Sequence, residues 1–173
     1  MDLVVIVLRL LHIVSGVLWV GAAFAFFLYV VPSSKALGPD RHGAFIEQMI
    51  KVRRFPRYVI TAGAITVLAG AALYWIDSDG FTSAWLRTPT GIGFSIGAVA
   101  GIASFALGPV AIAPTIAKLE AVGDRLKAEG RPPTPEEGAT LQALDRRMTT
   151  IGRVDLVLLS VAVAFMATSR YFG

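Results

Sequence analysis

Four apolar stretches dominate the 173-residue chain and constrain its fold more than any other feature. Each is long enough to cross the hydrocarbon core of a bilayer, which is about 30 Å thick and takes roughly 20 helical residues. Lipid offers backbone groups no hydrogen bonds, and no alternation of apolar and polar residues appears, so helices are favoured over barrel strands. The sequence therefore predicts an all-α bundle of four transmembrane helices, over about residues 3–31, 58–76, 91–113 and 154–172.

Prolines suggest where these helices end or bend. Pro32 is expected to end the first helix, because proline has no N–H to donate and its ring clashes with the preceding turn. Pro109 and Pro114 are expected to kink or close the third helix for the same reason.

The basic residues predict the orientation in the membrane. All but three of the 16 Lys and Arg fall between helices 1 and 2 or between helices 3 and 4, the exceptions being Arg9, Arg87 and Arg170. The positive-inside rule then puts both connections in the cytoplasm and both termini outside. Abundant Ala, Gly and Arg are typical of a GC-rich bacterial genome, so we expect a bacterial inner membrane with periplasmic termini. The net charge of +4 reflects this topology rather than nucleic-acid binding.

The two basic connections have helical patterns of their own. Residues 40–54 carry apolar residues at helical spacing, which predicts an amphipathic cytoplasmic segment that lies on the lipid surface or serves as a docking site. Residues 115–150 have two apolar repeats separated by a turn rich in Gly and Pro. They predict a helical hairpin that extends helices 3 and 4 into the cytoplasm, in which Thr134 caps the second helix of the hairpin.

Glycines recur every fourth residue in the third helix, at Gly93, Gly97 and Gly101. Small residues at this spacing let two transmembrane helices approach closely, so these glycines predict a tight helix contact, either within the chain or in a homodimer.

Little site chemistry remains in such a chain. The absence of Cys excludes disulfides, thiolate zinc sites and iron–sulfur clusters, and no nucleophile–base pair or phosphate-binding loop is evident. Whether the protein is an enzyme stays open. Asp155 is expected in the first turn of the fourth helix, paired with Arg57 or Arg153.

His12 is the informative residue, since ionisable groups inside spanning helices are costly and mark functional candidates. A membrane His can be a haem-iron ligand or can form a hydrogen bond to a neighbouring helix, and the residue itself is compatible with both roles. Arg9 lies one turn away, where it could pair with a haem propionate. His42 falls on the other side of the membrane, so a second ligand would be Met166, a second copy's His12, or none.

The first helix resembles that of a known group of membrane proteins. Its segment Leu-His-Ile-Val-Ser-Gly-Val-Leu-Trp-Val-Gly, residues 11–21, is similar to the opening helix of CopD-like and DUF2269-like bacterial proteins. Pro32, Arg53-Arg54-Phe55 and the closing Tyr74-Trp75 of the second helix fit the same layout. More distantly, the first-helix His is similar to that of HemJ-type protoporphyrinogen oxidases, which implies a haem-binding or redox-linked protein that uses His12.

Two functions follow as hypotheses. In the first, the bundle holds haem b through His12, with Arg9 and Met166 as further cofactor-binding residues, for electron transfer or tetrapyrrole redox chemistry. In the second, the protein binds no cofactor and is a structural or accessory subunit of a larger membrane complex, respiratory or photosynthetic. Its partners would be the lipid bilayer together with other subunits or a second copy.

Overall fold

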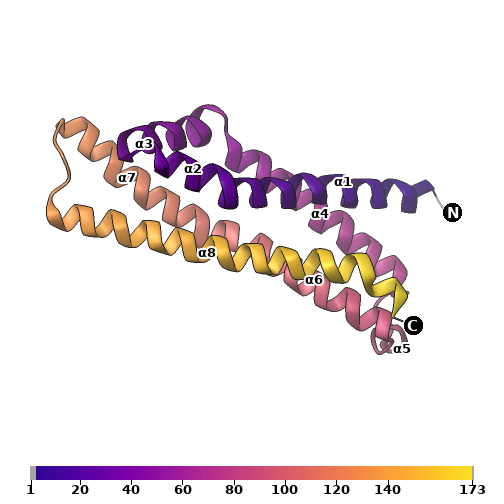
Figure 1. Ribbon diagram of the computed structural model, residues 1–173. Coiled ribbons are helices and arrows are strands. Elements are labelled where there is room, and N and C mark those ends of the chain that lie inside the picture. The colour runs from indigo at the N-terminus through magenta and orange to yellow at the C-terminus, as the bar shows by residue number, and fades with distance from the viewer. Residues whose placement is uncertain (1–2, 173) are drawn as a thin grey trace.

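The computed structural model describes residues 3–172, apart from the side chain of Asp40, and all regular secondary structure in this range is helical. The elements are, in order, α1 (Leu3–Ala25), the π-helical turn η1 (Phe26–Val30), α2 (Val31–Ala36), α3 (Pro39–Glu47), the π-helical turn η2 (Gln48–Val52), α4 (Phe55–Asp77), α5 (Ser83–Leu86), α6 (Pro89–Leu107), the π-helical turn η3 (Gly108–Ile112), α7 (Ala113–Glu129), α8 (Pro135–Thr168) and the 3-10 turn η4 (Ser169–Tyr171) (Figure 1).

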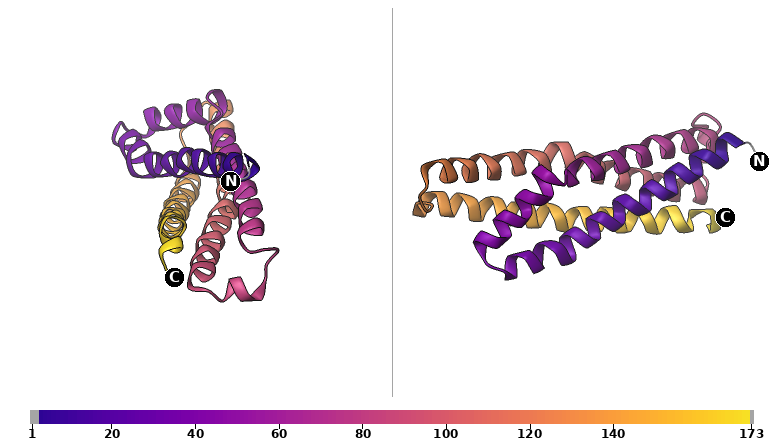
Figure 2. Two further views of the ribbon diagram at one scale, coloured as in Figure 1. Left: turned by 90° about the vertical axis from the view of Figure 1, so that its right-hand side faces the viewer. Right: turned by 90° about the horizontal axis from the view of Figure 1, so that it is seen from above.

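Four continuous helices within residues 3–172 are long and apolar enough to cross a membrane, which confirms the predicted all-α architecture. They span Leu3–Ala36, Phe55–Asp77, Pro89–Glu129 and Pro135–Tyr171. The first and last described residues lie at the same end of the bundle (Figures 1 and 2), here termed the terminal end. The opposite end, formed by α2, α3, η2 and the hairpin of α7 with the first part of α8, is termed the basic end.

The outer surface of the bundle is apolar. Leu68, Val99 and Val157 expose 71%, 69% and 63% of their surface, and most residues of each candidate span are not buried inside the chain. Water-soluble monomers rarely expose apolar patches of this extent. The four helices therefore have the length and the apolar outer surface that suit an integral membrane protein in contact with a lipid bilayer.

The expectation that Pro32 ends the first helix is wrong. The helix continues to Ala36, because the π-helical turn η1 precedes the proline and the N–H of Val31 bonds back to the carbonyl of Phe26. A π-helical turn is one residue wider than an α-helical one, so it absorbs the lost N–H and the bulk of the proline ring. The π-helical turn η3 contains Pro109 and precedes Pro114, and it accommodates these prolines in the same way. The third helix therefore continues to Glu129.

The bundle consists of two antiparallel helix pairs, α1 with α4 and α6 with α8, which make fewer contacts with each other (Figure 2). They meet at a small apolar core of Trp19 and Ala23 from α1, Ala62 from α4 and Leu159 from α8, with Phe105 of α6 packed against it. Leu159 is only 1% exposed and is the most buried residue of this core.

The glycine stripe of α6 faces α8. A Cβ atom on Gly97 would lie 3.2 Å from Cε of Met166, and one on Gly101 would lie 3.9 Å from Cβ of Ala162. A Cβ on Gly93 would collide with Ser169 of η4. In this chain the glycines therefore bring α6 and α8 of one molecule together.

At the basic end, ion pairs join the first connection to the hairpin. Lys51 of η2 pairs with Asp124 of α7 at 2.9 Å, and Lys35 of α2 pairs with Asp145 of α8 at 2.7 Å. Glu47 of α3 pairs with Lys127 of α7, whose hydrogen bond lowers the pKa of the Glu47 carboxyl. The amphipathic segment expected over residues 40–54 is thus α3 and η2, and its charged residues hold it to the hairpin.

Candidate functional site

The contact between α1 and α4 is built from large side chains of α1 that lie on glycines of α4. A Cβ on Gly70 would lie 2.7 Å from Cε1 of His12, and a Cβ on Gly63 would lie 3.2 Å from the ring of Trp19. The seven-residue step from His12 to Trp19 is matched by a seven-residue step back from Gly70 to Gly63, as antiparallel helices require. The glycines of α4 therefore make room for the imidazole and the indole.

The imidazole of His12 is held by the backbone of α4. Nδ1 lies 2.8 Å from the carbonyl oxygen of Thr66. A carbonyl oxygen only accepts, so Nδ1 carries the proton and donates, which leaves Nε2 as the nitrogen with the lone pair. Measured from a Cβ placed on Gly70, Nε2 is 3.8 Å away and Nδ1 is 2.8 Å away, so Nε2 is the ring nitrogen farther from this position on α4. Within residues 3–172, no hydrogen bond to Nε2 accompanies the one made by Nδ1.

Two hydroxyls continue the polar strip beside this hydrogen bond. The Oγ of Ser15 and the Oγ1 of Thr66 are 2.8 Å apart, and both side chains are buried. Each hydroxyl also lies near a backbone carbonyl one turn back, Thr66 near that of Ala62 at 2.8 Å and Ser15 near that of Leu11. Because each hydroxyl carries one proton, one of the two donates to its carbonyl and the other donates to its partner hydroxyl. Inside an apolar bundle such bonded hydroxyls fix the relative position of two helices, so the carbonyl that receives His12 is itself well fixed.

The other residues expected at a haem site lie in different surroundings. Arg9 is one helical turn from His12 towards the terminal end and is half-buried, and no ion pair among the described residues includes it. Met166 lies on Gly97 of α6, in the other helix pair. The structure thus brings His12 together with Gly70 and Thr66, while Met166 packs between α6 and α8.

Tyr74 and Ser95 link the two helix pairs near the terminal end. The Tyr74 hydroxyl is 2.5 Å from the Oγ of Ser95, and Ser95 donates to the carbonyl of Gly91 at 2.6 Å. Tyr74 is four residues beyond Gly70, the glycine on which His12 lies, so this pair is about one helical turn nearer the terminal end than His12. These hydroxyls satisfy each other and tie α4 to α6.

The second histidine belongs to the basic end. Nδ1 of His42 lies 2.8 Å from Oγ of Ser34, which itself donates to the carbonyl of Val31 at 2.9 Å. Partial burial lowers the pKa of His42, and the Lys35 ammonium lowers it further, against an opposing effect of the Asp145 carboxylate. His42 therefore braces the turn between α2 and α3, far along the bundle from His12.

The expectation for Asp155 is wrong. Since α8 begins at Pro135, Asp155 lies in the helix interior rather than in a first turn. It is 5% exposed and accepts a hydrogen bond from Ser104 of α6, and no ion pair among the described residues joins it to Arg57 or Arg153. No sequence pattern pairs Ser104 with Asp155, because the pairing depends on how α6 and α8 face each other.

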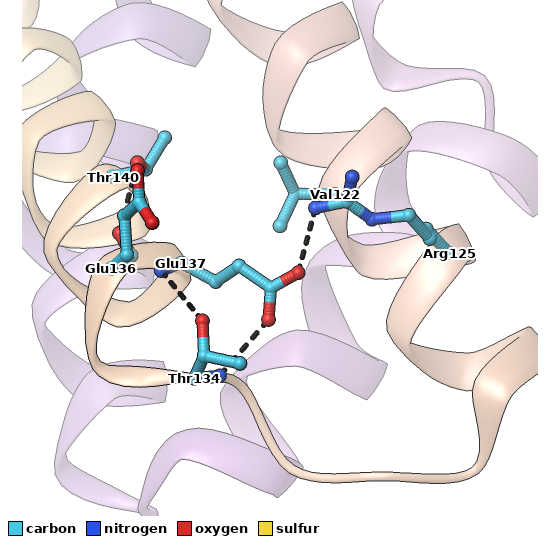
Figure 3. A pocket seen from close by; sticks show the side chains of 6 residues that line it. All are labelled: Val122, Arg125, Thr134, Glu136, Glu137 and Thr140. Atoms are coloured by element: carbon cyan, nitrogen blue, oxygen red, sulfur yellow. Dashed lines mark hydrogen bonds and ion pairs between the residues drawn. The ribbon is translucent and has the colours of Figure 1, made fainter.

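A polar cleft of about 340 Å³ lies at the tip of the hairpin between α7 and α8 (Figure 3). Glu137 occupies its centre: it pairs with Arg125 at 2.8 Å and accepts from the backbone N–H of Thr134 at 2.9 Å. Thr134 in turn caps α8 by accepting from the N–H of Glu137, as predicted. Arg131 also pairs with Glu137, at 2.7 Å, and lowers the pKa of that carboxyl to about 2. These groups satisfy one another, so the cleft is a helix cap rather than a binding site.

The described residues contain no group of three or more His, Asp or Glu that could hold a metal ion by themselves. His12 is consequently a candidate only for binding a metal ion that is already held within a cofactor. Sequence reasoning missed its partners Gly70 and Thr66, although the glycine-rich composition of the second helix was a signal for close packing. Comparison of the chain with protein-family models, with curated proteins and with solved structures finds no match.

Proposed function

We propose that this integral membrane protein binds haem b, with Nε2 of His12 as a ligand of the iron. The observation that carries the proposal is the hydrogen bond from Nδ1 to the carbonyl of Thr66. Histidines that ligate metals usually donate their other ring N–H to a carbonyl or carboxylate, which fixes the tautomer and raises the basicity of the ligating nitrogen. His12 has the hydrogen bond of this arrangement, and Nε2 makes no hydrogen bond within the described residues.

The surrounding residues support the same assignment. Arg9 is one turn away on α1 without a carboxylate partner among the described residues, so its guanidinium is suited to a propionate. Gly70 lets the imidazole lie against α4, and Ser15 bonds to Thr66 behind it. When bound, the haem would supply a reversible one-electron centre. Met166, which packs on Gly97, is left out of this ligand set.

We also propose an orientation of the protein and a cellular location. Because Lys and Arg are concentrated at the basic end, we assign that end to the cytoplasm of a bacterium and the terminal end to the periplasm. His12 would then lie in the outer half of the inner membrane, where an electron would be exchanged with a partner in the membrane or the periplasm.

The test is a reduced-minus-oxidised absorption spectrum of protein purified in detergent after expression with ample haem supply. We expect a b-type difference spectrum in the wild type and in the control His42→Ala, and its loss in His12→Ala. Thermal melts of the variants show whether His12→Ala is still folded. A flat wild-type spectrum, or normal haem content in folded His12→Ala, would refute the proposal.

A second candidate is a cofactor-free subunit of a larger membrane complex. Its supporting observation is the close fit of the His12 ring onto Gly70, since a helix–helix hydrogen bond of this kind needs no ligand. This function predicts a haem-free protein that co-purifies in fixed stoichiometry with other membrane proteins under mild detergent. A monodisperse, partner-free particle from the native membrane would exclude it.

A further inference from the structure

A buried acid lies between the two helices of the α6–α8 pair. Asp155 is 5% exposed and Ser104 is 3% exposed, and the Ser104 hydroxyl donates to Oδ1 of Asp155. One turn further along α8 is Leu159, the most buried residue of the core where all four helices meet. An ionisable group at such a position inside a bundle is expensive, which makes its protonation state a question about function.

The elements packed against this part of α8 supply no counter-ion. Neither α6, η3 nor η1 contains a charged residue, and the one charged residue of α1, Arg9, lies near the terminal end. On α7 the nearest charges are Lys118, which is exposed, and Glu120, and on α8 itself Arg153 is exposed. No ion pair within residues 3–172 reaches Asp155.

A carboxylate in this setting would be severely destabilised. Burying a charge is offset only by a counter-ion or by several strong hydrogen bonds, and Ser104 supplies a single neutral hydroxyl. A neutral carboxylic acid avoids that cost and keeps the hydrogen bond. We propose that Asp155 is a proton-binding site, with Ser104 donating to Oδ1 and the bound proton on Oδ2.

The depth of Asp155 indicates which side of the membrane supplies the proton. Asp155 is one residue inside the apolar run that begins at residue 154, whereas Thr168, at the far end of α8, is 13 residues or roughly 20 Å away. The proton is therefore exchanged with water at the basic end. Release of the proton would put a charge one turn from Leu159 and loosen the α6–α8 contact. This site is in a different helix pair from His12 and does not depend on haem.

The experiment is infrared spectroscopy of detergent-solubilised protein carrying ¹³C-labelled aspartate. At neutral pH we expect a protonated-carboxyl band in the wild type and in the control Asp145→Asn, and no such band in Asp155→Asn. Asp145 is a suitable control because it also lies on α8 but is exposed and paired with Lys35. In Ser104→Ala the band should persist at a shifted frequency, because its hydrogen bond is gone.

Asp155→Asn adds a second readout, since an amide has the shape and hydrogen-bonding capacity of the neutral acid. Its melting temperature should equal that of the wild type. A wild type without the protonated band at neutral pH, a band that persists in Asp155→Asn, or an Asp155→Asn variant that fails to fold would each overturn the proposal.

Discussion

Replacing Gly70 by alanine tests the packing of His12 directly. The added Cβ would lie 2.7 Å from Cε1 and 2.8 Å from Nδ1 of the imidazole, whereas ordinary contacts of a Cβ begin at 3.4 Å. The ring therefore has to move by the difference, about 0.7 Å. If it moves straight away from α4, the 2.8 Å bond to the Thr66 carbonyl lengthens to about 3.5 Å, which is no longer a hydrogen bond.

The energetic consequence follows from three effects. A hydrogen bond between transmembrane helices contributes about 0.6 kcal/mol on average and up to about 1.7 kcal/mol. Overpacking a well-packed contact costs about 1–3 kcal/mol. The higher helix propensity of alanine stabilises the helix by up to about 1 kcal/mol and offsets part of this loss. We therefore expect Gly70→Ala to lower the free energy of unfolding by about 0.5–4 kcal/mol.

The assay is equilibrium unfolding in mixed micelles, with Gly21→Ala as the matched control. Gly21 is on α1, and a Cβ placed there has no neighbour within 4 Å, so the same substitution should leave stability unchanged or slightly improved. ¹⁵N spectra of the histidine rings report separately on the Nδ1–H tautomer of His12, which should be perturbed only in Gly70→Ala. Equal stability of the two variants, with an unperturbed His12 tautomer, would refute this account of the α1–α4 contact.

Three further predictions concern the basic end. Thr134→Ala removes the side-chain acceptor of the α8 capping box and should cost about 1 kcal/mol, seen as faster hydrogen exchange in the first turn of α8. Because the pKa of Glu137 is lowered to about 2, its stabilising pairs are fully present above its ordinary pKa and are lost as the pH falls through about 2. NMR titration should show that Arg131→Gln moves this loss to higher pH, and an unchanged Glu137 titration would contradict the assignment. Near 1 M salt the Debye length falls to about 3 Å and weakens the ion pairs of the basic end, so α3 and η2 should become more sensitive to proteolysis. At low salt, a double variant that exchanges the charges of Lys51 and Asp124 should be as resistant to proteolysis as the wild type.

Helix boundaries show how far sequence patterns reach in this chain. Hydropathy located all four spans because a bilayer imposes a minimum apolar length. The rule that proline ends a helix failed at Pro32. There the π-helical turn η1 adds a residue to the turn that receives the proline ring, so the helix continues. The cap at Thr134 was predictable because it uses residues three apart in sequence.

The candidate sites divide in the same way. His12 stood out because a single ionisable residue in an apolar run is conspicuous in any sequence. Its contacts with Thr66 and Gly70 were not predictable, since they depend on the rotation and register of α1 against α4. The apolar run begins at residue 154, which favours a first-turn position for Asp155, whereas α8 begins at Pro135 and places Asp155 in the helix interior.

The sequence by itself determined that this chain is helical, has four segments long and apolar enough to cross a membrane and carries few groups for chemistry, because a backbone in lipid can satisfy its hydrogen bonds only within helices or closed barrels. Only the tertiary structure decided which polar residues meet. The partners of His12 and Asp155 are 54 and 51 residues away along the chain. Such pairings depend on how helices rotate, tilt and approach through their glycines, and no local pattern records those quantities.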